Sequence, residues 1–149
     1  MRCAMLLFVL LSVAFAPAPV YRQKPKPPKD EREAILGRWK LISRTFEGQA
    51  HRHAVAMLEV GKGRWTYTNA AGSWRSPWTF TLDVSGTPWR YHAKSEKQAI
   101  AQARGVCVVK GDKLTMCFTT DGEEAPEDLD GTKPGRHLDV YERIKPGAL

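Results

Sequence analysis

The sequence predicts an all-β fold, an antiparallel up-and-down barrel of about eight strands with one short N-terminal helix. Three observations lead to this prediction. From Arg38 onward, apolar residues recur with a period of two, as in strands that bury one face. Turn residues punctuate the same region at short intervals, which is typical of a meander. No helix-length periodic segment interrupts it, and a closed barrel would leave no exposed sheet edge.

The composition allows one packed domain, predicted over residues 34–146. The chain has 149 residues, 42% of them hydrophobic, which is enough apolar material for a single core. A formal net charge of +7 raises the question of nucleic-acid or membrane-surface binding. The basic residues gather in a Pro-rich arm, however, and the acidic ones gather between Asp121 and Asp130. Solvated polar segments explain this pattern best, and we expect no nucleic-acid partner.

Residues 1–16 have the pattern of a signal peptide. A short positive start precedes an apolar run over residues 4–16, which is too short to span a bilayer as a mature helix. Small residues favour cleavage after Ala14, or after Ala16 with Pro17 next to the cut. An uncleaved anchor is the alternative. We therefore expect export to the periplasm, the cell envelope or the medium, with no integral membrane span in the mature chain.

A tether and one helical turn are predicted to follow. Residues 17–33 form the tether, because their prolines and charges favour an extended chain. Asp30 and Glu33 have the spacing of a capping box, followed by an apolar turn over residues 34–36 and by Gly37 as a stop. These signals predict one short helix across an end of the barrel.

The strands are separated by turn residues, and the alternation is cleanest over residues 78–84. Residues 94–104 are ambiguous, because their Ala and Gln content allows a helical turn whereas residues 98–102 could form a short strand. The predicted strands are 38–46, 55–60, 64–69, 78–84, 89–93, 106–110, 113–119 and 136–144.

The register of the hairpin at Gly111-Asp112 decides the state of two cysteines. A Gly-first pair favours a two-residue type II′ turn. The resulting register pairs Lys110 with Lys113, Val109 with Leu114, Cys107 with Met116, and Val106 with Cys117. A disulfide would be the obvious expectation for an exported chain. In this register the cysteines face opposite sides of the sheet, so two free thiols are predicted, although a one-residue slip would bring them opposite each other.

Four segments carry a resemblance to known proteins. Gly37-Arg38-Trp39 resembles the Gly-x-Trp motif of lipocalins. More specifically, four segments, the first of which contains this motif, resemble in their order and spacing a lipocalin-like domain family of unknown function that is abundant in planctomycete bacteria. They are residues 36–40, 82–88, 111–117 and 140–143. Ala125-Pro126 stands where that family usually has Arg-Pro, and residues 94–98 lack its Gly-rich turn. The resemblance covers residues 34–145 and implies fold and export more than function.

The resemblance also implies a structural motif of Gly37, Trp39 and Arg143 at the closed end of the barrel. A C-terminal arginine packs over the motif tryptophan in lipocalins, and such a contact contributes roughly 0.5 to 2 kcal/mol. Strand parity weighs against it. If Leu138 and Val140 point inward, then Arg143 should point outward unless the strand twists or ends there.

We find no motif for catalysis or metal binding. His51 and His53 lack a third ligand nearby, and a solvated loop is the favoured interpretation. The acidic residues at 121–130 lack the ligand spacing of an EF-hand. His92 and His137 alternate with the apolar positions, which predicts exposed rings. We expect no catalytic residue, no metal and no cofactor, and therefore no enzyme.

Strand parity predicts an aromatic wall on three neighbouring strands. An eight-stranded barrel is just wide enough to hold one small ligand or to be filled by side chains, and aromatic side chains bury about 150 to 250 Å² each. Two functions stay open. One is an exported binding protein for a small apolar or amphipathic molecule, and the other is a non-enzymatic interaction module of the cell envelope with a filled barrel. The candidate ligand-binding residues are Trp65, Tyr67, Trp78, Phe80, Leu82, Trp89 and Tyr91.

Overall fold

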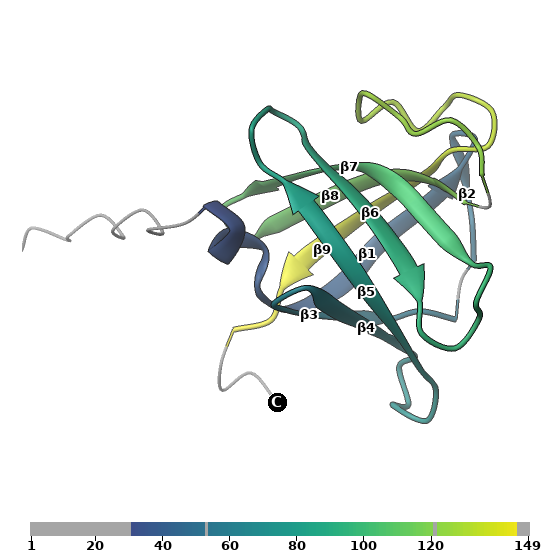
Figure 1. The fold of residues 1–149 in the computed structure, drawn as a ribbon. Coiled ribbons are helices and arrows are strands. Elements are labelled where there is room, and N and C mark those ends of the chain that lie inside the picture. Colours follow the sequence, from purple (N-terminus) through teal and green to yellow (C-terminus); the bar gives the residue numbers. More distant parts are fainter. Residues whose placement is uncertain (1–30, 53, 121, 146–149) are drawn as a thin grey trace, which may run out of the picture.

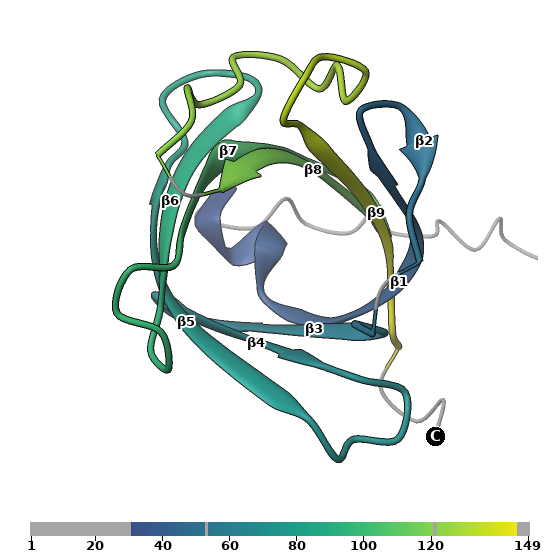
Figure 2. The same cartoon turned by 90° about the vertical axis from the view of Figure 1, so that its right-hand side faces the viewer.

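Within residues 31–52, 54–120 and 122–145, which the computed structural model describes, eight antiparallel strands close into a barrel (Figures 1 and 2). Closure comes from β1, which pairs with β3 along one edge and with β9 along the other. The short strand β2 adds a hairpin arm to the end of β1. The predicted all-β barrel is confirmed, whereas the predicted signal peptide and most of the predicted tether lie outside the described residues.

The strands follow one another around the barrel in sequence order. Each is antiparallel to its neighbours, as a meander requires. Their bounds are β1 (Gly37–Phe46), β2 (Gln49–Ala50), β3 (Met57–Gly61), β4 (Arg64–Thr68), β5 (Arg75–Asp83), β6 (Trp89–Ser95), β7 (Gln102–Lys110), β8 (Lys113–Thr120) and β9 (His137–Arg143).

Several strand boundaries differ from the sequence prediction, most of all at the start of β5 and at the β6–β7 turn. β5 begins at Arg75 rather than at residue 78, because the chain already pairs with β4 there. The ambiguous segment 94–104 forms neither a helical turn nor a strand of its own. Instead, β6 continues to Ser95 and β7 begins at Gln102, with a turn between them in which Ser95 N donates to Ala101 O at 3.0 Å.

The 3₁₀ turn η1 (Glu31–Ile35) lies across one end of the barrel, which we call the capped end (Figure 2). The predicted short helix is this single 3₁₀ turn. Trp39 Nε1 donates to Ile35 O at 2.9 Å, and Ile35 is 1% exposed, so the turn is fastened to the core. After Leu36, Gly37 begins β1 with a φ of +123°, a conformation that favours glycine. Among the described residues, no helix is long and apolar enough to cross a membrane.

The β7–β8 hairpin has the predicted register. Cys107 lies opposite Met116, and Cys117 lies opposite Val106. Gly111 has a φ of +59°, as the first position of a type II′ turn requires. Both cysteines are free and buried, and burial raises the pKa of Cys107 to about 12 and that of Cys117 to about 11. Neither thiol is therefore a thiolate near neutral pH.

Gly105 allows β7 and β8 to approach each other in the core. A Cβ built at this position would overlap Cys117 O and would lie 2.8 Å from Phe118 Cβ. Around it, side chains from the strands and from η1 form one apolar cluster. Its buried members are Ile35, Trp39, Leu58, Val60, Trp65, Tyr91, Ala93, Ala103, Cys107, Leu114, Met116, Phe118 and Tyr141.

Candidate ligand-binding site

The seven candidate residues come together on the inner faces of β4, β5 and β6. Trp65 and Tyr91 are buried, and the other five are partly buried and pack against the same core. The rings of Trp65 and Phe80 stack with centroids 4.6 Å apart, and Tyr91 meets Trp65 edge-on at 5.3 Å. Many contacts of this aromatic wall are therefore made between its own members.

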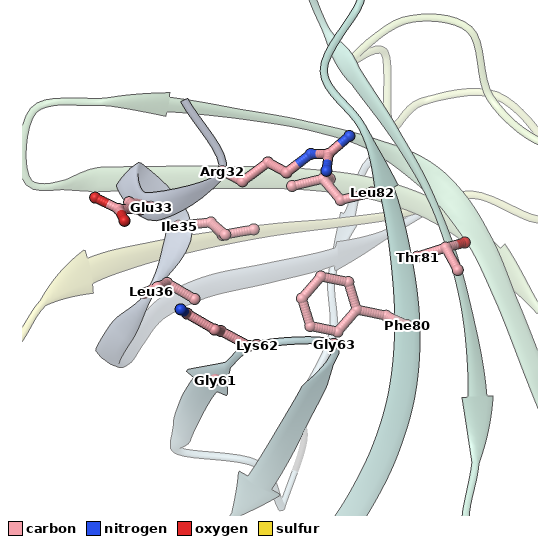
Figure 3. Close-up of a pocket in the computed structure, with 10 residues that line it drawn as sticks. All are labelled: Arg32, Glu33, Ile35, Leu36, Gly61, Lys62, Gly63, Phe80, Thr81 and Leu82. Carbon is pink, nitrogen blue, oxygen red and sulfur yellow. The ribbon is translucent and has the colours of Figure 1, made fainter. Parts of the chain in front are cut away.

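Phe80 and Leu82 also line a pocket at the capped end, between η1 and β5 (Figure 3). We call it the capped-end pocket. Its volume is about 480 Å³, which lies in the range of small-molecule sites. Ile35 and Leu36 line it from the η1 side, so four apolar side chains face a shared space. The remaining lining residues are Arg32, Glu33, Gly61, Lys62, Gly63 and Thr81.

The local sequence explains why this space stays open. Alternation along β5 turns Phe80 and Leu82 to the same side of the sheet. The β3–β4 connection is a two-residue turn, Lys62-Gly63, in which Gly63 has a φ of +68°. An added Cβ at Gly63 would lie 3.9 Å from Phe80 O, and Gly61 likewise brings no side chain. The turn therefore lines the pocket with backbone atoms, and Lys62 is the one residue between its two glycines that has a side chain.

The polar residues of the pocket lie at its rim. Arg32 extends from η1 toward Leu82, and Lys62 extends from the turn toward Leu36 (Figure 3). The carboxylate of Glu33 lies on the side of η1 away from Phe80. An apolar wall with a few charged groups at its edge can bind a molecule that has one apolar and one polar end.

The predicted stacking of Arg143 on Trp39 is present next to this pocket. The guanidinium carbon of Arg143 lies 4.0 Å from the centroid of the Trp39 ring. Its Nη1 and Nη2 atoms donate to Leu36 O at 2.8 Å and to Ala34 O at 2.6 Å. Arg143 thereby holds both the motif tryptophan and the chain at η1.

The parity assumed for the last strand was wrong. Asp139 and Tyr141 are 0% exposed, whereas Leu138 and Val140 are only partly buried. The inward face of β9 therefore carries the polar residues together with Arg143. This alternation is what places Arg143 over the indole.

A buried charged pair lies inside the barrel, and sequence reasoning missed it. Arg44 Nε and Nη2 donate to the two carboxylate oxygens of Asp139, and Tyr141 Oη donates to Asp139 Oδ2 at 2.7 Å. Burial alone would lower the pKa of Arg44, but the hydrogen bond and charge of Asp139 raise it. Burial, followed by the charge of Asp139, raises the pKa of Tyr141 well above its usual value.

A β-bulge brings Arg44 to the interior. Trp39 and Leu41 face the core at the start of β1, but the register with β9 shifts between Leu41 and Ser43. The extra residue, Ile42, is 55% exposed. After it the inward positions change parity, so Arg44 points inward instead of outward.

His137 was predicted to have an exposed ring, and this was wrong. The ring is partly buried near the end of the barrel opposite η1, which we call the far end, and stacks on Phe118 at 5.0 Å. Phe46 lies 4.6 Å away, measured between ring centroids. Burial first, and then the charge of Arg44, lowers the pKa of His137. His92 is also partly buried, with Nε2 3.0 Å from Gln102 Oε1, and His53 lies outside the described residues.

In the described part of the acidic segment 121–130, aspartates are hydrogen-bonded to the residues that follow it. Asp128 accepts from Lys133 Nζ at 3.0 Å and from Arg136 Nη1 at 2.6 Å. The Lys133 hydrogen bond is the largest cause of the lowering of the Asp128 pKa to about 2. Asp130 accepts from Thr132 N at 3.0 Å. Across the described ranges, no three His, Cys, Asp or Glu side chains are grouped to hold a metal ion.

No family model matches the chain, and the search of curated proteins returns no match. The structure itself defines the class: a closed, eight-stranded antiparallel barrel, within the described residues, that is consistent with a lipocalin-like fold.

Proposed function

We propose that this chain is a non-enzymatic binding protein for a small apolar or amphipathic molecule. The observation that carries the proposal is the capped-end pocket, where Phe80 and Leu82 face Ile35 and Leu36 across about 480 Å³. Stacking on Trp65 fixes the ring of Phe80, so one wall of the pocket is formed in advance. A preformed apolar surface binds an apolar molecule without first being ordered.

The proposal extends to family and location. The segments that resemble the planctomycete lipocalin-like family favour membership in it, and the apolar run at residues 4–16 supports export to the periplasm, the envelope or the medium. An exported barrel on a Pro-rich tether is suited to holding a ligand near a surface.

A second candidate, an interaction module with a filled barrel, is favoured by a different observation. Trp65 is 1% exposed and packs against Phe80 and Tyr91, so aromatic side chains occupy much of the interior. In that case the barrel would serve as a scaffold, and a protein partner would meet its loops.

Titration with N-phenyl-1-naphthylamine, a neutral probe that fluoresces in apolar sites, tests the proposal. We expect saturable binding by the wild type. Leu82→Ala should weaken it by about three- to tenfold, because a buried methylene contributes about 0.8 kcal/mol and 1.4 kcal/mol is a factor of ten. Leu41→Ala is the matched control, since Leu41 packs against the same core without lining the pocket.

The possible outcomes separate the two candidates. Absence of any saturable signal with the wild type would leave the interaction module. Binding that Leu82→Ala and Leu41→Ala weaken equally would contradict the capped-end pocket as the site.

A further inference from the structure

The charges at the rim of the capped-end pocket indicate the chemical class of its ligand. We propose that the pocket binds an amphiphile with an anionic head group, whose chain lies on Phe80 and Leu82 and whose head lies between Arg32 and Lys62. This inference rests on the proposed function, since it requires that the pocket take a ligand.

The apolar part of the site suits an unbranched chain. Phe80 and Leu82 are partly buried neighbours on one face of β5, and Ile35 and Leu36 lie across from them (Figure 3). Trp65 supports Phe80 from behind by stacking. A chain in this space would cover apolar surface that the fold leaves open, at roughly 25 cal/mol per Å² removed from water.

Lys62 supplies a positive charge that the fold itself does not use. Among the described residues, its ammonium group makes no hydrogen bond or ion pair. The two glycines beside it leave the turn without other side chains, and Lys62 extends from the turn toward Leu36, at the rim (Figure 3). An anionic group at this position would gain a charged partner without breaking an existing contact.

Arg32 supplies the second positive charge, from the opposite side of the pocket. Its side chain extends from η1 toward Leu82 (Figure 3). Its charge also contributes to lowering the pKa of Asp83, after the hydrogen bonds from Ser85 and the charge of Arg90. The nearest lining carboxylate, that of Glu33, lies away from Phe80, so the apolar wall is bordered by cations.

The barrel interior is a poorer place for an anionic head. Its guanidinium, that of Arg44, is already bound by both oxygens of Asp139, and Tyr141 donates to the same carboxylate. An entering anion would have to displace Asp139 or be buried beside it, which is unfavourable. At the rim of the capped-end pocket, by contrast, an anion could contact Lys62 without displacing a carboxylate.

Calorimetric titration with three ligands that share one chain isolates the head group. We expect decanoate to bind more tightly than 1-decanol, and decyltrimethylammonium to bind most weakly. Added salt should weaken decanoate and leave 1-decanol unchanged, because salt screens only the charged contact. Lys62→Gln should weaken decanoate by about two- to fivefold, as expected for one solvent-exposed charge contact, without affecting 1-decanol.

Matched variants give the control. Arg32→Gln should reproduce the effect of Lys62→Gln. Lys110→Gln should leave all three affinities unchanged, because Lys110 is an exposed lysine beside the β7–β8 turn and does not line the pocket.

Different results would contradict this inference and the proposed function. Equal binding of decanoate and 1-decanol, insensitive to Lys62→Gln and Arg32→Gln, would overturn the anionic head group while binding stands. If none of the three ligands binds although N-phenyl-1-naphthylamine does, the inference is wrong and the proposed function stands; if the probe does not bind either, both are wrong.

Discussion

Arg143 at the capped end and Arg44 near the far end both turn a guanidinium into the same barrel, but different groups compensate their charges. Arg143 lies over the Trp39 ring and donates to two backbone carbonyls, and its side chain remains 25% exposed. The Arg44 side chain is 6% exposed and is paired with the Asp139 carboxylate, whose side chain is 0% exposed. The first arrangement needs no buried anion, whereas the second places two full charges in the interior.

This difference predicts how each end responds to the loss of one partner. Without Arg143, the capped end keeps two neutral carbonyls, the buried indole of Trp39 and the solvent-exposed carboxylate of Asp112, so no buried charge is left without a partner. Without Asp139, the interior keeps an uncompensated positive charge, and desolvation of such a charge is expensive. The capped end should therefore tolerate the loss of one partner better than the interior does.

Asp139→Ala should give the largest loss of stability. Removing one partner of a buried ion pair lowers the free energy of unfolding by about 3 to 5 kcal/mol. Urea unfolding followed by tryptophan fluorescence measures this. The double variant Arg44→Met with Asp139→Leu removes both charges and should recover most of the loss. A double variant less stable than Asp139→Ala would contradict this account of the interior.

Arg143→Gln should give a smaller loss, about 1 to 3 kcal/mol. The estimate combines a cation–π contact of about 0.5 to 2 kcal/mol with hydrogen bonds worth about 0.5 to 1.5 kcal/mol each. Arg104→Gln is the control, since Arg104 is exposed on β7 and should change stability by less than about 0.5 kcal/mol. If Arg143→Gln cost more than Asp139→Ala, the order of the two ends would be reversed.

The sequence was sufficient for the barrel because its signals are local. Alternation along β5 and the Gly111-Asp112 turn each determine a strand or a register without help from distant residues. The motif resemblance indicated the Trp39 and Arg143 contact, which parity alone argued against. The buried pair of Arg44 and Asp139 was missed because a bulge at Ile42 changes which residues of β1 face inward. No local sequence pattern indicates this bulge.

The capped-end pocket was predicted only in part. Phe80 and Leu82 were expected on an inner face, and they line the pocket. The other side of the pocket comes from η1 and the β3–β4 turn. Their position depends on tertiary contacts, such as the hydrogen bonds from Trp39 and Arg143 to η1 and the backbone beside it. The alternation of apolar and polar residues does not indicate that the β3–β4 turn lies close to η1.

The smallest expected effect is a pH dependence at the far end, from His137. Burial, Arg44 and His51 lower its pKa below the usual 6.5, while Asp139 opposes them. The unfolded chain therefore binds a proton at a higher pH than the folded chain does. Stability should be fully present above pH 6.5 and should fall as the pH drops from that value through the folded pKa.

His137→Phe tests this dependence while keeping a ring between Phe46 and Phe118. Urea unfolding of the wild type and the variant, compared above and below the usual histidine pKa, isolates the contribution of His137, because all other titrating groups are shared. We expect the wild type to lose more stability than the variant on acidification. Arg44 supplies part of the pKa shift, so the double variant Arg44→Met with Asp139→Leu should reduce the pH dependence of His137. Parallel pH profiles for the wild type and His137→Phe would show that folding does not lower the pKa of His137.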